Sequence, residues 1–474
     1  MISVSKYIIL FFLALPFFAI SSLNYNKDIE KAHNAILNFE FQKAQRILKF
    51  EKKTNPNNHY VNYLNNYQLF LKAYFNAQNS DYDKFIKSSD LSLKILENEK
   101  NRETASILSA TISIQRAFIF FLWSEHLSYV KALMQGQGYV DDINTKTSNI
   151  EYLKIRSIYE VLGGSIPNKY KSYAKWFNLK GSAKKGIELI EHYLKVSKSK
   201  SAKQVEGKMI ELYLKHFLNI QPPSLPEQNT PLLLIYLDLQ TSKENAQIKI
   251  NKIDRIKYNL PPYFTFLKAK FLIELQNKNG VSLMNQFIQK QKGLSLLHSA
   301  HYYLSWFYCA NDEPQLSQSE IAKMKELPSP LFPADKKALN RIEKEHCNSY
   351  LVKSRMLFDA GEYKRALNVL KTKQATASLI NYEQKIEYLY RLARIYENIN
   401  LIDKALKLYQ KVIDTQKTEL YFVAFSAYRS GEIYLNKQNY KLAKTFFSMA
   451  LELNEGEYKS SIESKCQYAI ESID

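Results

Sequence analysis

The sequence predicts an all-α protein, built as a solenoid of antiparallel helix hairpins. Small and aromatic residues recur at matched helical offsets near both ends of the chain. The 12 Gly and 13 Pro leave few of the breaks that a many-stranded β fold needs. At 474 residues, a single compact domain would be unusual, whereas a repeat array has no such size limit. The 46% hydrophobic content excludes a disordered chain.

The N-terminus has the pattern of a secretory signal. Lys6 supplies a positive charge, an apolar run covers residues 7–20, and Ala19 and Ser21 offer a small-residue cleavage site. The alternative is an uncleaved anchor, but this run is shorter than the roughly 20 residues that a membrane span needs. We therefore expect residues 1–22 to be a cleaved signal, with export to the periplasm or cell envelope of a bacterium.

Helix hairpins are predicted directly after this segment. The first one places small or apolar residues at the positions where two helices cross, and a proline where its second helix ends: Ala32, Ala35, Ala44, Leu48 and Pro56. A second pair is expected over 60–94. Residues 103–134 then predict one apolar core helix, ended by Gly136 and Gly138, that does not span a membrane.

Two proline clusters divide the rest of the chain. They lie at 222–231 and 328–333, and they predict an N-terminal helical block over 23–220, a middle block over 221–327 and a C-terminal block over 328–474. We expect these blocks to be packed sub-arrays more than independent domains.

The C-terminal block carries the clearest repeat. Its small and bulky residues recur in two matched sets, with Ala366 marking an earlier unit: Ala393, Tyr396, Ala405 and Tyr409, then Gly431, Tyr434, Ala443, Phe447 and Ala450. Ala366, Ala405 and Ala443 are 39 and 38 residues apart, so each unit is expected to carry about one helical turn more than a repeat of ~34 residues. Small residues let two helix backbones approach, and aromatic residues fill the space beside the crossing.

These positions resemble the tetratricopeptide repeat, most closely that of exported bacterial proteins, over 29–56 and 347–474. The resemblance implies a superhelix whose concave groove, lined by the first helix of each pair, binds a peptide or a partner helix. In that register six residues face the groove: Arg355, Tyr390, Arg391, Arg394, Tyr428 and Arg429. They suit an acidic peptide or a chain terminus. They lack the Asn and Lys pattern of the carboxylate clamp in chaperone-binding members. The alternative is that the arginines pair with Glu362, Glu387 and Glu397 on the helix surface.

The net charge limits the classes of partner that we expect, and the cysteine content limits the number of disulfides. The net charge is +20, or +19 without Lys6, which favours polyanions, but the lysines are scattered and do not favour nucleic acid. Three cysteines exclude a dense disulfide framework. A bridge between Cys309 and Cys347 is one alternative. The preferred interpretation is that these two and Cys466 pack as small hydrophobic thiols.

No catalytic motif is evident. His298 and His301 lie three residues apart, but we interpret them as part of a packed aromatic helix and expect no metal or cofactor. The sequence therefore predicts a non-enzymatic, exported scaffold or adaptor that binds a protein or peptide in its groove. The alternative is an anionic envelope polymer or glycan bound by the basic surface, and a third hypothesis is a hydrolase whose cleft contains the two histidines and distant carboxylates.

Overall fold

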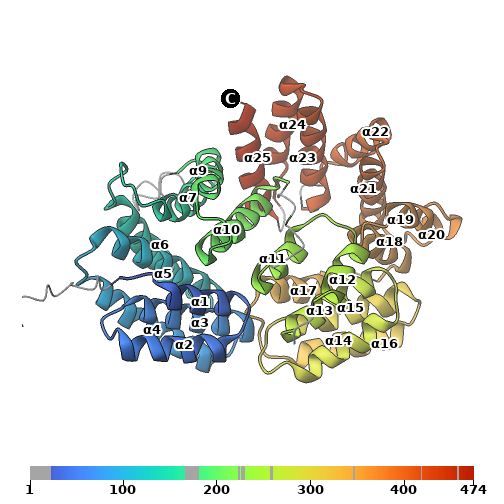
Figure 1. Cartoon of the computed structure of the whole chain (residues 1–474). Helices are drawn as coiled ribbons and strands as arrows, with labels where there is room; N and C mark the ends of the chain where they lie inside the picture. The colour runs from blue at the N-terminus through green and yellow to red at the C-terminus, as the bar shows by residue number, and fades with distance from the viewer. Residues whose placement is uncertain are drawn as a thin grey trace, which may run out of the picture.

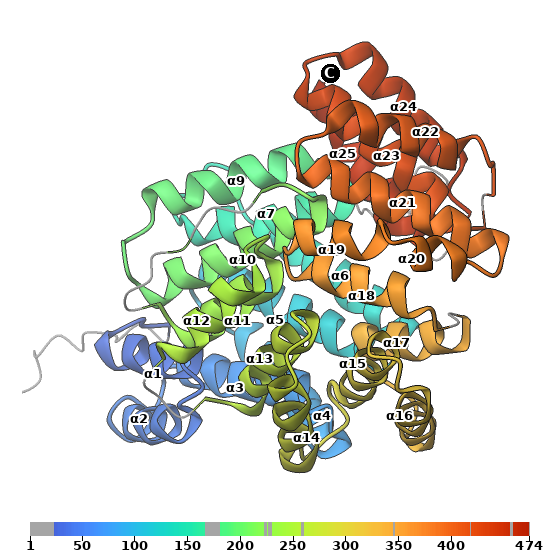
Figure 2. The ribbon, with the colours of Figure 1, turned by 90° about the vertical axis from the view of Figure 1, so that its right-hand side faces the viewer.

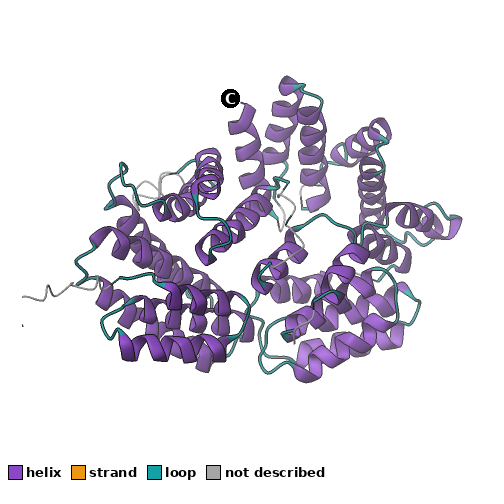
Figure 3. Ribbon diagram, in the orientation of Figure 1, coloured by secondary structure: helices purple, strands orange, loops and turns teal. Residues whose placement is uncertain are grey.

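The structure of the chain is a computed structural model. It describes residues 23–165, 181–221, 225, 230–256, 260–344, 347–417, 419–455 and 458–473. The predicted signal segment 1–22 lies outside these residues. Helices and connecting loops make up the described chain, without a strand in it (Figure 3), so the predicted all-α class is confirmed.

The helices follow one another in three groups (Figure 1). The first group is α1 (Lys27–Leu37), α2 (Phe41–Thr54), α3 (Tyr60–Asn76), α4 (Asn79–Leu96), α5 (Arg102–Leu122), α6 (His126–Asp141), α7 (Glu151–Gly164), α9 (Ala183–Val196) and α10 (Ala202–Leu218). The middle group is α11 (Leu232–Thr241), α12 (Ala246–Asp254), α13 (Pro262–Glu274), α14 (Asn279–Lys290), α15 (Leu297–Ala310) and α16 (Pro314–Glu326). The last group is α17 (Pro333–Lys344), α18 (Ser349–Asp359), α19 (Tyr363–Leu370), α20 (Lys373–Ala377), α21 (Tyr382–Asn398), α22 (Ile402–Ile413), α23 (Tyr421–Asn436), α24 (Tyr440–Glu452) and α25 (Lys459–Ile473).

Neighbouring helices pair into hairpins, and the predicted small residues lie at their crossings. Seven of the predicted alanines are fully buried: Ala32, Ala44, Ala366, Ala393, Ala405, Ala443 and Ala450. A Cβ on Gly431 would come within 2.7 Å of the Phe447 ring, so α23 and α24 meet there at the closest distance that glycine allows. Tyr434 stacks on Phe446 beside this crossing, with 5.3 Å between ring centroids, while Tyr396 packs against the cores of two successive hairpins.

Helix ends follow the local sequence. Asn26, Asn348, Asn381 and Asn439 precede helices, and each side chain accepts a hydrogen bond from a backbone N–H of the first turn. Pro56 lies two residues beyond the end of α2, as the repeat spacing predicts. The extra length of the C-terminal units forms the short helix α20 in one unit and lengthens the link between α22 and α23 in the next.

The prediction of one helix over 103–134 is wrong. Helix α5 ends at Leu122, and Ser124 adopts a left-handed conformation with φ 61°. The Glu125 N–H donates to the Phe120 carbonyl at 2.8 Å, which satisfies an end group of α5 and lets α6 start directly. Gly136 therefore does not end a helix. It lies inside α6, where a Cβ would overlap the Tyr159 hydroxyl oxygen at 1.7 Å.

Helix α5 also has the length and composition of a membrane span, with a mean hydropathy of 1.6 over its apolar window. Within the described chain it is the one helix that passes this test, and 72% of that window is buried inside the protein. Its apolar side chains mostly pack on neighbouring helices, as they do in a core helix.

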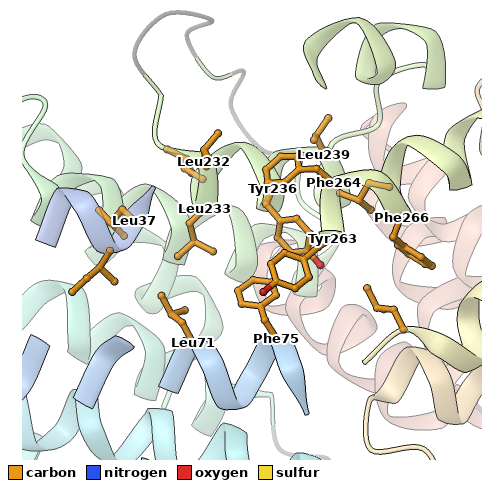
Figure 4. Packing of buried hydrophobic residues seen from close by; sticks show 14 of the residues in the cluster. Leu37, Leu71, Phe75, Leu232, Leu233, Tyr236, Leu239, Tyr263, Phe264 and Phe266 are labelled. Atoms are coloured by element: carbon orange, nitrogen blue, oxygen red, sulfur yellow. The ribbon is translucent and has the colours of Figure 1, made fainter. Parts of the chain in front are cut away.

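The largest hydrophobic core joins the three predicted blocks. Phe75 of α3 stacks on Tyr263 of α13 with 4.3 Å between ring centroids, and Tyr236 of α11 packs beside them (Figure 4). The same cluster extends to Met356 and Ala360. Side chains from all three predicted blocks therefore share one core.

The array also closes on itself. The C-terminal helix α25 packs against α9 and α10 of the first group (Figures 1 and 2). The Ser464 hydroxyl donates to the Ser165 carbonyl at 3.3 Å, and Tyr468 joins an apolar cluster with Val161 and Leu214. Contacts between α25 and helices that lie far earlier in the sequence therefore constrain the curvature of the solenoid.

A buried ion-pair network holds the first group together. The Lys154 ammonium lies 2.8 Å from Glu206 and 2.7 Å from Glu151, and His33 of α1 contacts Glu206 at 3.1 Å. Burial disfavours the Glu206 carboxylate, but Lys154 and His33 outweigh burial and lower its pKa. Removing one partner would leave a buried charge unpaired.

The interpretation of all three cysteines as packed free thiols is wrong for two of them. Cys309 in α15 and Cys347 before α18 form a disulfide at a sequence separation of 38, and the loop that it closes contains α16 and α17. Cys466 is a buried free thiol, as expected. The bridge formed because the fold brings both residues together, which their spacing in the sequence does not reveal.

Candidate partner-binding site

The first helices of the C-terminal hairpins line a concave pocket of about 320 Å³, here named the basic pocket. Its walls come from α17, α18, α21, α23 and the turn before α25, and they comprise Lys337, Arg341, Ser354, Arg355, Phe358, Asp359, Tyr390, Arg391, Arg394, Ile395, Tyr421, Phe425 and Tyr458. Five of these side chains are basic and one is acidic. A volume of this size is typical of a specific binding site.

Aromatic rings hold the basic side chains in place. The Arg355 guanidinium stacks on the Trp306 ring at 4.2 Å, and Lys337 lies over Tyr458 at 4.5 Å. Arg341 donates to the Tyr458 hydroxyl at 2.7 Å, and Arg394 donates to the Tyr390 hydroxyl at 3.3 Å. The pocket is therefore preorganised, which reduces the entropy lost when a ligand orders these long side chains.

Positive charge extends beyond the pocket along α25. Burial and the Arg429 guanidinium lower the pKa of Lys465 to about 8, with Lys337 and Arg394 acting in the same direction. A lysine whose neighbours disfavour its own charge marks a local surplus of cations. An anionic group bound here would relieve that repulsion.

Four of the six predicted groove residues meet in the basic pocket: Arg355, Tyr390, Arg391 and Arg394. Tyr428 and Arg429 do not line it. Tyr428 is only 2% exposed, and its hydroxyl accepts a hydrogen bond from Asn219, the residue that ends α10, at 2.8 Å. The chain's own first group therefore covers this part of the predicted groove.

A family model for the tetratricopeptide repeat matches residues 386–418 and 426–457. The first match spans most of α21 and α22, and the second spans most of α23 and α24. The C-terminal block contains tetratricopeptide repeats. Such repeats generally form protein-interaction scaffolds, and most proteins built from them are not catalytic. A comparison with curated proteins found no match to the chain.

The sequence did not point to the pocket residues outside the tetratricopeptide repeats. Lys337 and Arg341 belong to α17, which precedes the first C-terminal hairpin, and Tyr458 lies in the turn before α25. No repeat register assigns them to the groove. Tyr421 could have been found, because it lies seven residues before Tyr428 and thus on the same face of α23.

The alternative prediction, that the groove arginines pair with neighbouring glutamates, is confirmed in part. Arg391 donates to Glu387 at 2.6 Å through its Nε, and Arg394 and Arg429 each lie 3.8 Å from Glu397. These pairs are not solvated surface charges, because the side chains of Arg391, Arg394 and Arg429 are 11–21% exposed. Glu362, which was expected to pair with a groove arginine, approaches Arg365 instead.

A second concave surface lies between α2 and α3 and has a volume of about 720 Å³. This lysine groove is lined by Gln45, Leu48, Lys49, Lys52, Lys53, Val61, Asn62, Asn65, Gln68, Leu69 and Lys72. Four of these side chains are ammonium groups, four are amides, and none is acidic. Amides and ammonium groups together suit an acidic sugar, since they can bind both hydroxyls and carboxylates.

The two histidines occupy a packed helix. His298 is 1% exposed and His301 is 7% exposed, within the aromatic helix α15, and His301 contacts Glu320 at 2.7 Å. Neither histidine lines the basic pocket or the lysine groove. Within the described chain, no group of three metal-ligating side chains gathers in a geometry suited to a metal ion.

Proposed function

We propose that this protein is an exported adaptor that binds an acidic segment of a partner protein in the basic pocket. The observation that carries the proposal is the pocket itself, where guanidinium groups held by tyrosines surround a concave space. Guanidinium groups bind carboxylates through paired hydrogen bonds, and tyrosines supply rigid contact area. Most of the lining comes from first helices of the hairpins, which is the face that scaffolds of this type use.

Export is proposed on the N-terminal pattern of charge, apolar run and small residues. The Cys309–Cys347 bridge supports it, because disulfides persist mainly in oxidising compartments such as the bacterial periplasm. Fractionation of cells that produce the full chain tests this point. A protein recovered in the cytoplasm with residues 1–22 intact would contradict it.

Binding to an acidic peptide tests the pocket. We would measure fluorescence anisotropy of a labelled Glu-rich decapeptide against the matching Gln-rich one. The Glu peptide should bind more tightly, and K337Q with R391Q should weaken it at least tenfold, since a hydrogen bond to a charged group contributes about 1.5–3 kcal/mol.

The matched control changes the same number of charges elsewhere. K364Q with K371Q removes two exposed cations from α19 and its end, which do not line the pocket. The control variant should bind the peptide like the wild type. Equal losses in both variants would show that net charge, and not the pocket, attracts the peptide.

A second candidate function is binding of an anionic glycan or envelope polymer in the lysine groove, which carries no acidic side chain. Polygalacturonic acid is a suitable probe. Its binding should fall steeply between low and moderate salt, because many exposed charges are screened. It should also be lost in K49Q with K53Q, whereas binding of the Glu peptide should not change in that variant.

A further inference from the structure

A separate cavity of about 230 Å³ lies where α11, α12, α13 and α15 meet α18. Its walls carry charges of both signs, and we name it the charged cavity. The groups that matter are Glu244, Lys249, Lys270, Glu274, Tyr303 and Asp359. The space is well above the ~10–15 Å³ that one water needs, and it is large enough for a small organic molecule.

Two buried groups of opposite charge belong to this cavity. Lys249 is 9% exposed, and its ammonium donates to the Ser242 carbonyl at 2.7 Å without an ion pair to any described carboxylate. Glu274 is 4% exposed, and the nearest ammonium, that of Lys270, lies 3.7 Å away. Buried charges in proteins are normally paired at hydrogen-bond distance, so both groups have unused binding capacity.

The ionisation of both groups agrees with this geometry. Burial and Lys270 lower the pKa of Lys249 to about 8. Burial raises the pKa of Glu274 to about 7, with Asp359 adding to the effect and Lys270 opposing it. Each charged form is therefore incompletely compensated by the protein.

We propose that the charged cavity binds a small zwitterion, a molecule with one ammonium and one carboxylate, of which a free α-amino acid is the simplest. Its carboxylate would lie between Lys249 and Lys270, and its ammonium would lie against Glu274 with Asp359 at the exposed edge. Such a ligand supplies both missing partners at once, whereas an amine or an acid supplies one. The proposal does not rest on the adaptor function, although Asp359 borders both the charged cavity and the basic pocket.

The test is isothermal titration calorimetry on the full chain. A thermal-shift screen of the twenty amino acids would select a ligand for titration against its two halves. For valine these are isobutylamine, which lacks the carboxylate, and 3-methylbutanoic acid, which lacks the ammonium. We expect the amino acid to bind at least tenfold more tightly than either half. Failure of all twenty to bind, or an amine that binds as tightly as the amino acid, would overturn the proposal.

Three variants locate the ligand. K249M and E274Q should each weaken binding at least tenfold, while K268M, on the same helix as Glu274 but outside the cavity, should have no effect. Circular dichroism would verify the fold, and D359N at the exposed edge provides a variant that leaves the buried groups intact. If K249M, E274Q and D359N, all folded, bind the amino acid like the wild type, the site is elsewhere and the proposal is wrong.

The pH dependence gives an independent readout. Affinity should be greatest between about pH 7 and pH 8, where Glu274 is largely ionised and Lys249 still holds its proton. Neighbouring helices and links add further ionisable groups that face Glu274 and Lys249. These groups are Asp238, Glu244, Lys270, Tyr303 and Asp359. Raised pKa values keep Lys270 charged and Tyr303 neutral across this range. An affinity that is constant from pH 6 to pH 9 would contradict the assignment.

Discussion

Replacing Gly431 by alanine should destabilise the C-terminal hairpin, although the same change usually stabilises a helix. A Cβ at this position would lie 2.7 Å from two atoms of the Phe447 ring, which is fully buried and packs against Tyr428 with 5.9 Å between ring centroids. Because the ring is fully buried, it has little room to move aside, so we take the upper part of the 1–3 kcal/mol range for overpacking, about 3 kcal/mol. Helix propensity returns about 1 kcal/mol, which leaves a net loss of about 2 kcal/mol.

Hydrogen exchange measured by mass spectrometry is the appropriate assay, because a long array does not unfold in one step and a single melting temperature would not report on one hairpin. A loss of about 2 kcal/mol should speed exchange in α23 and α24 roughly thirtyfold when opening is at equilibrium. The matched control is G138A in α6, where a Cβ meets no atom within 4 Å. It should slow local exchange about two- to fivefold, from ~0.5–1 kcal/mol of helix propensity.

The double variant G431A with F447L separates overpacking from other causes. Leucine has no Cε1 atom, and its smaller side chain can turn its Cδ atoms away from the new methyl group, so the two changes together should cost less than the sum of their separate effects. Exchange in α23 and α24 that is unchanged or slower in G431A would refute the packing argument.

Three further predictions concern the buried charges and the bridge. K154M should cost about 3–5 kcal/mol and speed exchange in α7 and α10, because the largely buried Glu206 and Glu151 carboxylates lose the ammonium group that they share; E206Q in the same chain should recover part of the loss. Reduction of Cys309–Cys347, or C309S with C347S, should lower stability by up to about 4 kcal/mol for a loop closed across a sequence separation of 38, seen as faster hydrogen exchange in the segment from α15 to α18. The pKa of Glu274 is raised in the folded state, so stability should decline by up to about 3 kcal/mol between pH 4.5 and 7 as the unfolded chain loses a proton that the folded chain retains. E274Q should flatten that decline in thermal melts, and an unchanged pH dependence would show that Glu274 is not its source.

Much of the candidate site was within reach of sequence reasoning, because four pocket residues lie on first helices whose register the repeat defines. Tyr390, Arg391 and Arg394 lie within one turn of α21, and Arg355 lies one repeat of 39 residues before Arg394, so the repeat register assigns all four to the groove. Lys337 and Tyr458 were not predicted, because their positions depend on how α17 and the turn before α25 pack against the groove face of the hairpins.

By itself, the sequence determined the all-α class, the hairpin crossings at Ala405, Gly431 and Ala443, and the end of α2 near Pro56. These features depend on neighbours within one or two helices, and local spacing encodes them. Only the tertiary structure decided that the array closes on itself, with Asn219 on Tyr428, and that Cys309 and Cys347 meet. The contact of Asn219 with Tyr428 joins residues that are far apart in the sequence, so it depends on the summed curvature of the hairpins between them, whereas the bridge depends on how α16 and α17 pack between its two cysteines.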